Sequence, residues 1–206
     1  EVVVADLEGS VHVFGADGSV RALRADTGAQ VWGTFTDGPV RFAPTLWRDR
    51  LFVAGDDGFL TCLAVGDGRV LWRRRGGPVD SLVLGNGRMI SRWLARGGPA
   101  VVDDTVYFAA GIWPSEGIYL YALDAGGGAV KWCNDTAGFA YTPQPHGGAN
   151  ARSGVSANGY LAAAGDRLLV PTGRGVPAGF DAATGKLLYF HLQRYGKTGG
   201  SAVVAE

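Results

Sequence analysis

The sequence has few of the features that mark membrane, disulfide-bonded or metal-binding proteins. No apolar segment approaches the roughly eighteen residues of a membrane-spanning helix, and no basic start followed by an apolar stretch opens it. The two cysteines, Cys62 and Cys133, cannot form a disulfide framework, and no Cys-x-x-Cys pair or Cys/His cluster is present to bind zinc. With 19 basic and 19 acidic residues, the formal net charge of zero argues against nucleic-acid binding.

Helical periodicity is also missing, whereas glycine is abundant. The 206 residues include 34 glycines, and 47% of the chain is hydrophobic, which is typical of a globular protein with many turns. Short alternating or apolar segments such as 51–65, 105–111 and 118–124 are typical of β-strands. The sequence therefore predicts an all-β protein.

A repeat is the strongest signal in the sequence. Four segments align without gaps: ALRADTGAQVW (22–32), CLAVGDGRVLW (62–72), ALDAGGGAVKW (122–132) and GFDAATGKLLY (179–189). The glycine suits a turn with positive φ, and an aromatic residue follows it four positions later. The two aligned columns are Gly28, Gly68, Gly128 and Gly185, followed by Trp32, Trp72, Trp132 and Tyr189.

Each repeat contains four short strands, which predicts one blade of a β-propeller. A first strand precedes the aligned part of each unit, as in RFAPTLW (41–47) and GYLAAAG (159–165). We expect a single propeller segment of about four four-stranded antiparallel blades, part of a ring of seven or eight. The predicted blades cover approximately 1–36, 41–75, 97–135 and 159–192, and residues 199–206 are expected to start the next blade.

The aromatic column has a structural interpretation. An aromatic residue that opens the outermost strand can pack between blades, against the turn glycine of a neighbour. Burial of 150–250 Å² at about 25 cal/mol per Å² would contribute on the order of several kcal/mol at each site. Cys62 aligns with Ala22 and Ala122 and is expected to be a small core residue.

The motifs VHVFGADGSVRALRADTGAQVW and LFVAGDDGFLTCLAVGDGRVLW resemble the PQQ-like β-propeller repeat with its tryptophan-docking motif. That family includes quinoprotein dehydrogenases, which use pyrroloquinoline quinone and Ca²⁺, and the non-catalytic propeller lipoprotein of the outer-membrane barrel assembly machinery. The resemblance implies a periplasmic or cell-envelope location, with the export signal outside this sequence. It also implies a quinone site with Glu and Asn ligands, an Asp base and often two adjacent cysteines, yet Cys62 and Cys133 are isolated.

Two long insertions interrupt the repeat. The aromatic columns are separated by 40, 60 and 57 residues, and the extra residues fall mainly in 73–99 and 133–159, with a smaller excess in 111–117. In an up-and-down blade these connections all lie at one end, here called the top face, where loops often carry function. Guanidinium groups and aromatic rings there could bind a carboxylate, a sulfate or a sugar, or the loops could simply seal the ring. The candidate binding residues are Arg88, Arg92, Trp93, Trp113, Glu116, His146, Asn150 and Arg152.

Three functions are compatible with these features. The first is a non-catalytic scaffold that binds a protein or glycan through its top face without a cofactor, because no catalytic set is recognisable. The alternative is a fragment of a PQQ- and Ca²⁺-dependent dehydrogenase. The third is an enzyme in which His146 and the loop arginines act on an anionic or sugar substrate. Because a four-blade arc leaves two blade faces open, we also expect the chain to dimerise or aggregate.

Overall fold

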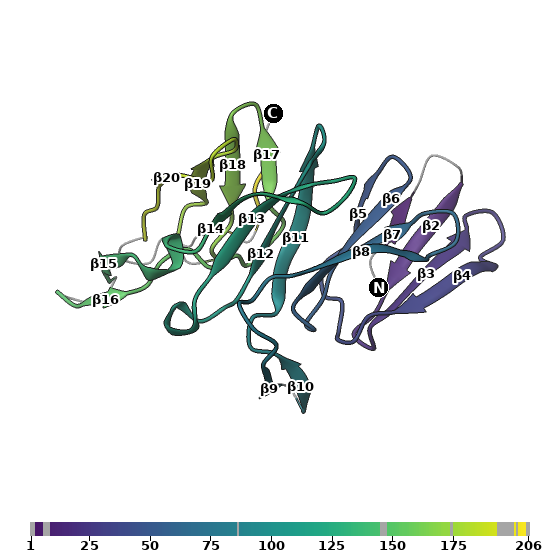
Figure 1. Cartoon of the computed structure of the whole chain (residues 1–206), viewed down its shortest axis with the longest axis horizontal. Helices are drawn as coiled ribbons and strands as arrows, with labels where there is room; N and C mark the ends of the chain where they lie inside the picture. Colours follow the sequence, from purple (N-terminus) through teal and green to yellow (C-terminus); the bar gives the residue numbers. More distant parts are fainter. Residues whose placement is uncertain are drawn as a thin grey trace.

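The computed structural model describes residues 3–5, 9–85, 87–144, 148–173, 175–192, 200 and 202–204. Four four-stranded antiparallel sheets follow one another along the chain and lie side by side along its long axis (Figure 1). Each is one blade, and in each the strands are paired in sequence order. The predicted all-β partial propeller is therefore confirmed.

The blades share one layout of strands. Blade 1 contains β1 (Val3–Ala5), β2 (Ser10–Phe14), β3 (Ser19–Arg24) and β4 (Gln30–Phe35). Blade 2 contains β5 (Thr45–Trp47), β6 (Arg50–Ala54), β7 (Phe59–Ala64) and β8 (Val70–Arg75). Blade 3 contains β11 (Ala95–Val102), β12 (Thr105–Ala110), β13 (Tyr119–Asp124) and β14 (Val130–Asn134). Blade 4 contains β17 (Ala162–Ala164), β18 (Arg167–Val170), β19 (Ala178–Asp181) and β20 (Leu187–Tyr189).

The remaining elements belong to the insertions. The link between blades 2 and 3 forms a hairpin of β9 (Leu82–Gly85) and β10 (Arg88–Ser91), which projects from the blades (Figure 1). The link between blades 3 and 4 forms a short 3-10 turn, η2 (Ala137–Phe139), and a hairpin of β15 (Tyr141–Pro143) and β16 (Asn150–Arg152). A second 3-10 turn, η1 (Pro114–Glu116), lies between β12 and β13.

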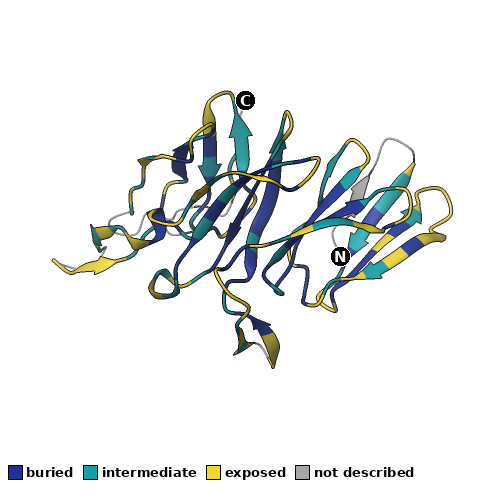
Figure 2. Ribbon diagram, in the orientation of Figure 1, coloured by how far each residue is buried: buried dark blue, intermediate teal, exposed yellow. Residues whose placement is uncertain are grey.

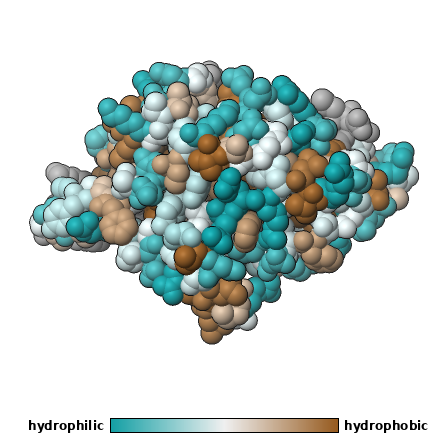
Figure 3. All heavy atoms as spheres, in the orientation of Figure 1, coloured by the Kyte–Doolittle hydropathy of each residue, from teal (hydrophilic) through white to brown (hydrophobic). Residues whose placement is uncertain are grey.

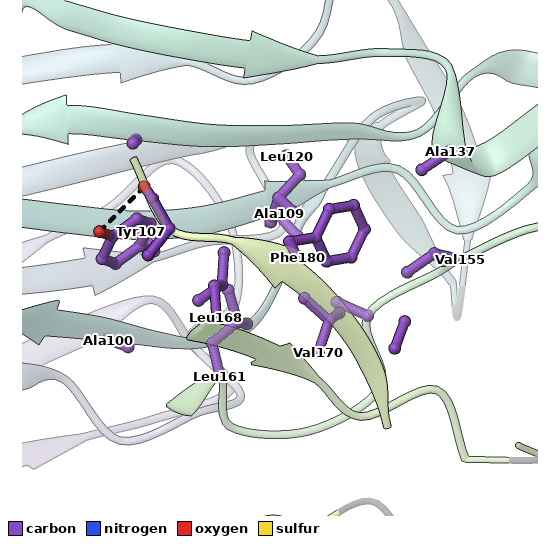
Figure 4. Packing of buried hydrophobic residues seen from close by; sticks show 14 residues of the cluster. Ala100, Tyr107, Ala109, Leu120, Ala137, Val155, Leu161, Leu168, Val170 and Phe180 are labelled. Atoms are coloured by element: carbon purple, nitrogen blue, oxygen red, sulfur yellow. Dashed lines mark hydrogen bonds between the residues drawn. The ribbon is translucent and has the colours of Figure 1, made fainter. Parts of the chain in front are cut away.

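The hydrophobic core lies between consecutive blades. Alternation along each strand sends one face of a blade toward the blade before it and the other toward the blade after it. The buried residues form three clusters, one at each blade-to-blade junction, and the buried segments of Figure 2 follow these junctions. Figure 4 shows the junction of blades 3 and 4, where Phe180 and Leu168 meet Ala109 and Leu120. Cys62 is fully buried in the junction of blades 2 and 3, as expected.

Each docking tryptophan packs on the turn glycine of the next blade. Trp32 lies over Gly68, where a Cβ would overlap the indole ring, and its indole N–H donates to the Val65 carbonyl at 2.6 Å. The same pairing joins Trp72 to Gly128 and Trp132 to Gly185. A side chain at Gly68 would therefore displace the ring, and its φ of 72° further favours glycine.

The expected strand at 199–206 is not seen in the part that the structure describes. Gly200 and residues 202–204 have no strand pairing, and the other residues of the segment lie outside the described ones. Gly200 accepts one hydrogen bond from the Gly173 amide at 3.3 Å.

Candidate functional site

The top face brings the insertions together, as the strand directions require. The Ser91 amide, at the end of the first insertion, donates to the Asp56 carbonyl in the β6–β7 turn at 2.8 Å. The Ser156 hydroxyl, in the second insertion, donates to the Ile112 carbonyl in the β12–β13 connection at 3.3 Å. All the long connections thus meet at one end of blades 2 to 4.

Four of the predicted residues tie the first insertion to the blades. The Arg88 guanidinium donates to the Ala16 carbonyl of blade 1 at 2.7 Å. Arg92 forms an ion pair with Glu116 at 2.9 Å, and the Trp93 indole N–H donates to the Glu116 carbonyl at 2.6 Å. These side chains therefore hold the loops in place across three blades.

Trp93 does not offer an open aromatic surface. Its side chain is 7% exposed, and its ring covers Gly77, where a Cβ would lie 2.7 Å from the indole. Backbone hydrogen bonds fix the two residues that follow Trp93: the Ala95 amide donates to the Gly55 carbonyl, and the Leu94 carbonyl accepts from the Gly111 amide. The Trp93 ring packs the loop against blade 3, which leaves little of its surface available to a ligand.

The second insertion places its predicted residues apart from the first. Asn150 and Arg152 are exposed on β16, with the Arg152 guanidinium 5.8 Å from the centre of the Phe139 ring. Trp113 is 45% exposed beside η1. His146 lies outside the described residues. Of the predicted residues that the structure describes, Arg88, Arg92 and Trp93 thus belong to the first insertion, Trp113 and Glu116 to the β12–β13 connection, and Asn150 and Arg152 to the second insertion.

A pocket of about 200 Å³ lies between the second insertion, the β12–β13 connection and the end of blade 4. Apolar side chains face Ser and Thr hydroxyls across it, and no charged residue is among the described residues that line it. The Thr172 hydroxyl oxygen is buried and has no hydrogen-bond partner among the residues that the structure describes. The lining residues are Ile112, Pro114, Gln144, Ser153, Gly154, Ser156, Thr172, Phe190 and Leu192.

None of the seven candidate binding residues that the structure describes lines this pocket. Gln144, Ser153 and Ser156 belong to the second insertion, so the length of that insertion pointed to them. Thr172 and Phe190 were missed, although both follow from the repeat. Thr172 lies in the β18–β19 connection, and the connection between the second and third strands lies at the top face in each blade. Phe190 directly follows Tyr189, which occupies the docking position of blade 4.

The β9–β10 hairpin exposes an apolar face. Leu84 pairs with Met89 and Leu82 pairs with Ser91, so these four side chains share one side of the hairpin. Leu82, Leu84 and Met89 are 53%, 77% and 56% exposed. The opposite side carries the buried Ile90. Figure 3 shows the resulting hydrophobic patch at the lower tip of the molecule, over β9 and β10.

The donor groups of the described residues do not fit a Ca²⁺-bound quinone. No group of three or more His, Cys, Asp or Glu side chains in this part of the chain could hold a metal ion, and the pocket carries no carboxylate. Burial raises the pKa of the Cys62 thiol to about 12 and also raises that of Cys133. Cys133 lies on β14 of blade 3 and Cys62 on β7 of blade 2.

The described residues contain no helix long and apolar enough to cross a membrane. No curated protein sequence matches the chain. The sequence profile described as outer membrane protein assembly factor BamB matches residues 3–133, which is more than half of the chain.

Several solved structures share the fold at low sequence identity. Quinohemoprotein alcohol dehydrogenase from Comamonas testosteroni superposes with a TM-score of 0.70 and 17% identity over 94% of this chain and 34% of its own. BamB from Moraxella catarrhalis gives a TM-score of 0.57 and 19% identity over 95% of this chain and 65% of its own. The computationally designed Ika4 protein gives a TM-score of 0.57 and 14% identity over 88% and 91% of the two chains.

The chain thus spans about a third of the dehydrogenase and just under two thirds of BamB. At these identities the solved structures establish the fold alone. The family follows from the profile match, together with the repeated strand, glycine and tryptophan pattern. The chain belongs to the PQQ-like β-propeller family that includes the outer membrane protein assembly factor BamB.

Proposed function

We propose that this chain is a non-catalytic scaffold of the cell envelope that binds a protein partner through the β9–β10 hairpin. The observation that carries the proposal is the exposed face formed by Leu82, Leu84 and Met89. Exposed apolar patches of this kind mark interaction surfaces in soluble proteins. The relatives support it too, since the matched family is named for an assembly factor.

The hairpin has the properties of a docking element rather than of a lid. Isolated two-stranded hairpins are marginally stable in water, yet this one exposes large apolar side chains. Arg92 and Trp93 hold its base, and Arg88, next to its turn, donates to the Ala16 carbonyl of blade 1, so little order has to be gained when a partner binds. Leucine and methionine adapt their shape to a partner surface. A protein surface with an apolar groove is therefore the expected ligand.

A photo-crosslinking amino acid at position 84 tests the proposal in the native cell envelope. We expect one discrete crosslinked protein at position 84 and none at position 188, where Leu188 has a 41% exposed side chain on blade 4. The purified partner should then bind the Leu84→Ser/Met89→Ser variant at least tenfold more weakly, with an unchanged melting temperature. Equal crosslinking at both positions, or unchanged affinity of the double variant, would contradict the proposal.

The absence of a cofactor is part of the same proposal. Calorimetric titration of pyrroloquinoline quinone into the chain, with and without Ca²⁺, is expected to give no saturable heat, because the pocket lacks carboxylate ligands. Saturable Ca²⁺-dependent binding at one quinone per chain would favour the dehydrogenase alternative instead.

A further inference from the structure

We infer that the pocket at the junction of blades 3 and 4 binds a neutral sugar ring. The inference goes beyond the proposed function, since the described residues that line the pocket include none from the β9–β10 hairpin. It rests on four properties of the pocket: its place between two blades, its fixed wall, a buried hydroxyl group and an uncharged lining.

The pocket lies inside a junction whose two blades are both described. Phe190 lines it and packs against the hydrophobic cluster that blades 3 and 4 share. Alternation along the chain directs Tyr189, the preceding residue, to the other side of blade 4. Across the pocket, the bond from the Ser156 hydroxyl to the Ile112 carbonyl joins the second insertion to blade 3. The walls are therefore built from blades 3 and 4 and the link between them.

The wall formed by the second insertion is fixed by its backbone. The three amides of residues 153–155 donate to carbonyls of residues 137–140 at 3.0 to 3.1 Å. Gly154 comes so close to η2 that a Cβ would lie 2.0 Å from the Ala137 carbonyl oxygen. Val155 belongs to the hydrophobic core (Figure 4), whereas its neighbours Gly154 and Ser156 line the pocket. A wall held in this way is preformed, so a ligand binds without a large loss of conformational entropy.

The Thr172 hydroxyl group is a hydrogen-bonding group that the described residues leave unused. Its oxygen is buried and lies on the pocket lining. Glycine at position 175 leaves room beside it, because a Cβ there would lie 3.1 Å from this oxygen. A buried hydroxyl without a partner is unfavourable, and a ligand hydroxyl supplies the missing bond. Ser153 and Gln144 bring a further hydroxyl and an amide to the same lining.

The charge and size of the pocket define the class of ligand. Its described lining carries no charged side chain, so an ion would lose its hydration without gaining a counter-charge. Ile112, Phe190 and Leu192 supply apolar surface beside the hydroxyl groups. A sugar ring matches both, since it has apolar C–H faces, hydroxyl groups at its edge and no charge. The volume of about 200 Å³ lies below the roughly 300 to 1,000 Å³ of sites for drug-sized ligands, and therefore suits a single ring.

Calorimetric titration of the chain with D-glucose, D-galactose, D-mannose and N-acetyl-D-glucosamine tests the inference. We expect saturable binding of at least one of these sugars at millimolar concentration. D-glucuronate adds a carboxylate to the same kind of ring and should bind at least tenfold more weakly than the best neutral sugar. No saturable heat with any of the four sugars, or equal binding of D-glucuronate, would overturn the inference.

A Thr172→Val variant locates the site. It should bind the sugar at least tenfold more weakly without a lower melting temperature, because the hydroxyl group makes no hydrogen bond to the described residues that the variant would lose. Thr34→Val is the matched control, since Thr34 is a half-buried threonine on β4 of blade 1, and its affinity should be unchanged within twofold. If Thr172→Val binds the sugar as tightly as the wild type, the pocket is not the site and the inference fails.

Two further comparisons complete the test. The Leu84→Ser/Met89→Ser variant should keep its affinity for the sugar, so that the pocket and the hairpin are tested separately. A free monosaccharide and the terminal residue of a glycan share the same ring chemistry, and the methyl glycoside of the bound sugar distinguishes them. Equal affinity for the methyl glycoside supports the end of a glycan as the ligand, and at least tenfold weaker binding supports a free sugar.

Discussion

Blades 1 and 2 carry nearly the same sequence pattern but lie in different surroundings. Gly28 and Gly68 have φ values of 70° and 72°, and Asp17 and Asp57 occupy the same position in the β2–β3 and β6–β7 turns. Among the described residues, blade 2 packs against a blade on each side and its β6–β7 turn contacts the first insertion, whereas blade 1 packs against blade 2. The repeat thus fixes the backbone conformation of a residue, while the neighbouring blade determines how much that residue contributes to stability.

Substitution of the turn glycines is expected to give the largest difference in stability between the two blades. A Gly68→Ala substitution combines an unfavourable positive φ with displacement of the Trp32 ring and should cost about 3 kcal/mol or more. Gly28→Ala meets no ring and should cost about 1 kcal/mol from the backbone conformation alone. Urea denaturation of both variants at one protein concentration measures the difference. Equal losses would show that the Trp32 contact contributes little.

Substitution of the docking aromatic residues should give a smaller difference in stability, here between blades 3 and 4. Trp132→Phe removes ring area and the hydrogen bond from the indole N–H to the Ala182 carbonyl, which is 2.9 Å long. We expect a loss of about 2 kcal/mol in the free energy of unfolding. Tyr189→Phe is the control, since Tyr189 is 39% exposed, and it should change the free energy of unfolding by less than about 0.5 kcal/mol. A Trp132→Phe variant as stable as the control would contradict this difference.

The repeat made the fold predictable, whereas the site depends on contacts between distant segments. The four-residue spacing from Gly28 to Trp32 recurs in each repeat and can be read from a short stretch of sequence. It predicts the strands, the turn and the order of the blades together. The burial of Trp93 depends on Gly77 and Glu116, which come close only when two loops meet. Composition alone suggested that an arginine- and tryptophan-rich loop binds a ligand, although several of these side chains bond within the loops.

The insertions illustrate the same limit. Chain topology predicts that they share the top face, because strand number fixes the end at which each connection lies. It does not predict which side of the β9–β10 hairpin faces outward, since both sides of that hairpin carry apolar residues. The exposed positions of Leu82, Leu84 and Met89 follow only from the direction in which the hairpin leaves the blade.

The smallest expected effect concerns the turn carboxylates. Burial raises the pKa of Asp57 despite its ion pair with Arg73 at 2.8 Å, whereas hydrogen bonds from Ser19 lower the pKa of Asp17. A carboxyl group whose pKa is raised by folding stabilises the folded state at pH values below its pKa in the unfolded chain. This stabilisation is lost as pH rises through the pKa of the folded state. A carboxyl group whose pKa is lowered by folding acts in the opposite way. Its stabilisation is present at pH values above its pKa in the unfolded chain and is lost as pH falls through the pKa of the folded state.

Asp57→Asn and Asp17→Asn should therefore change the pH dependence of stability with opposite signs. Between pH 3 and pH 7, Asp57→Asn should gain stability relative to the wild type as pH rises, and Asp17→Asn should lose it. Denaturant unfolding at several pH values measures both slopes, and carboxyl titration by NMR assigns them to the two residues. If the two variants change stability with pH in the same direction, Asp57 is not buried in the folded protein, and the two turns share one environment as well as one sequence pattern.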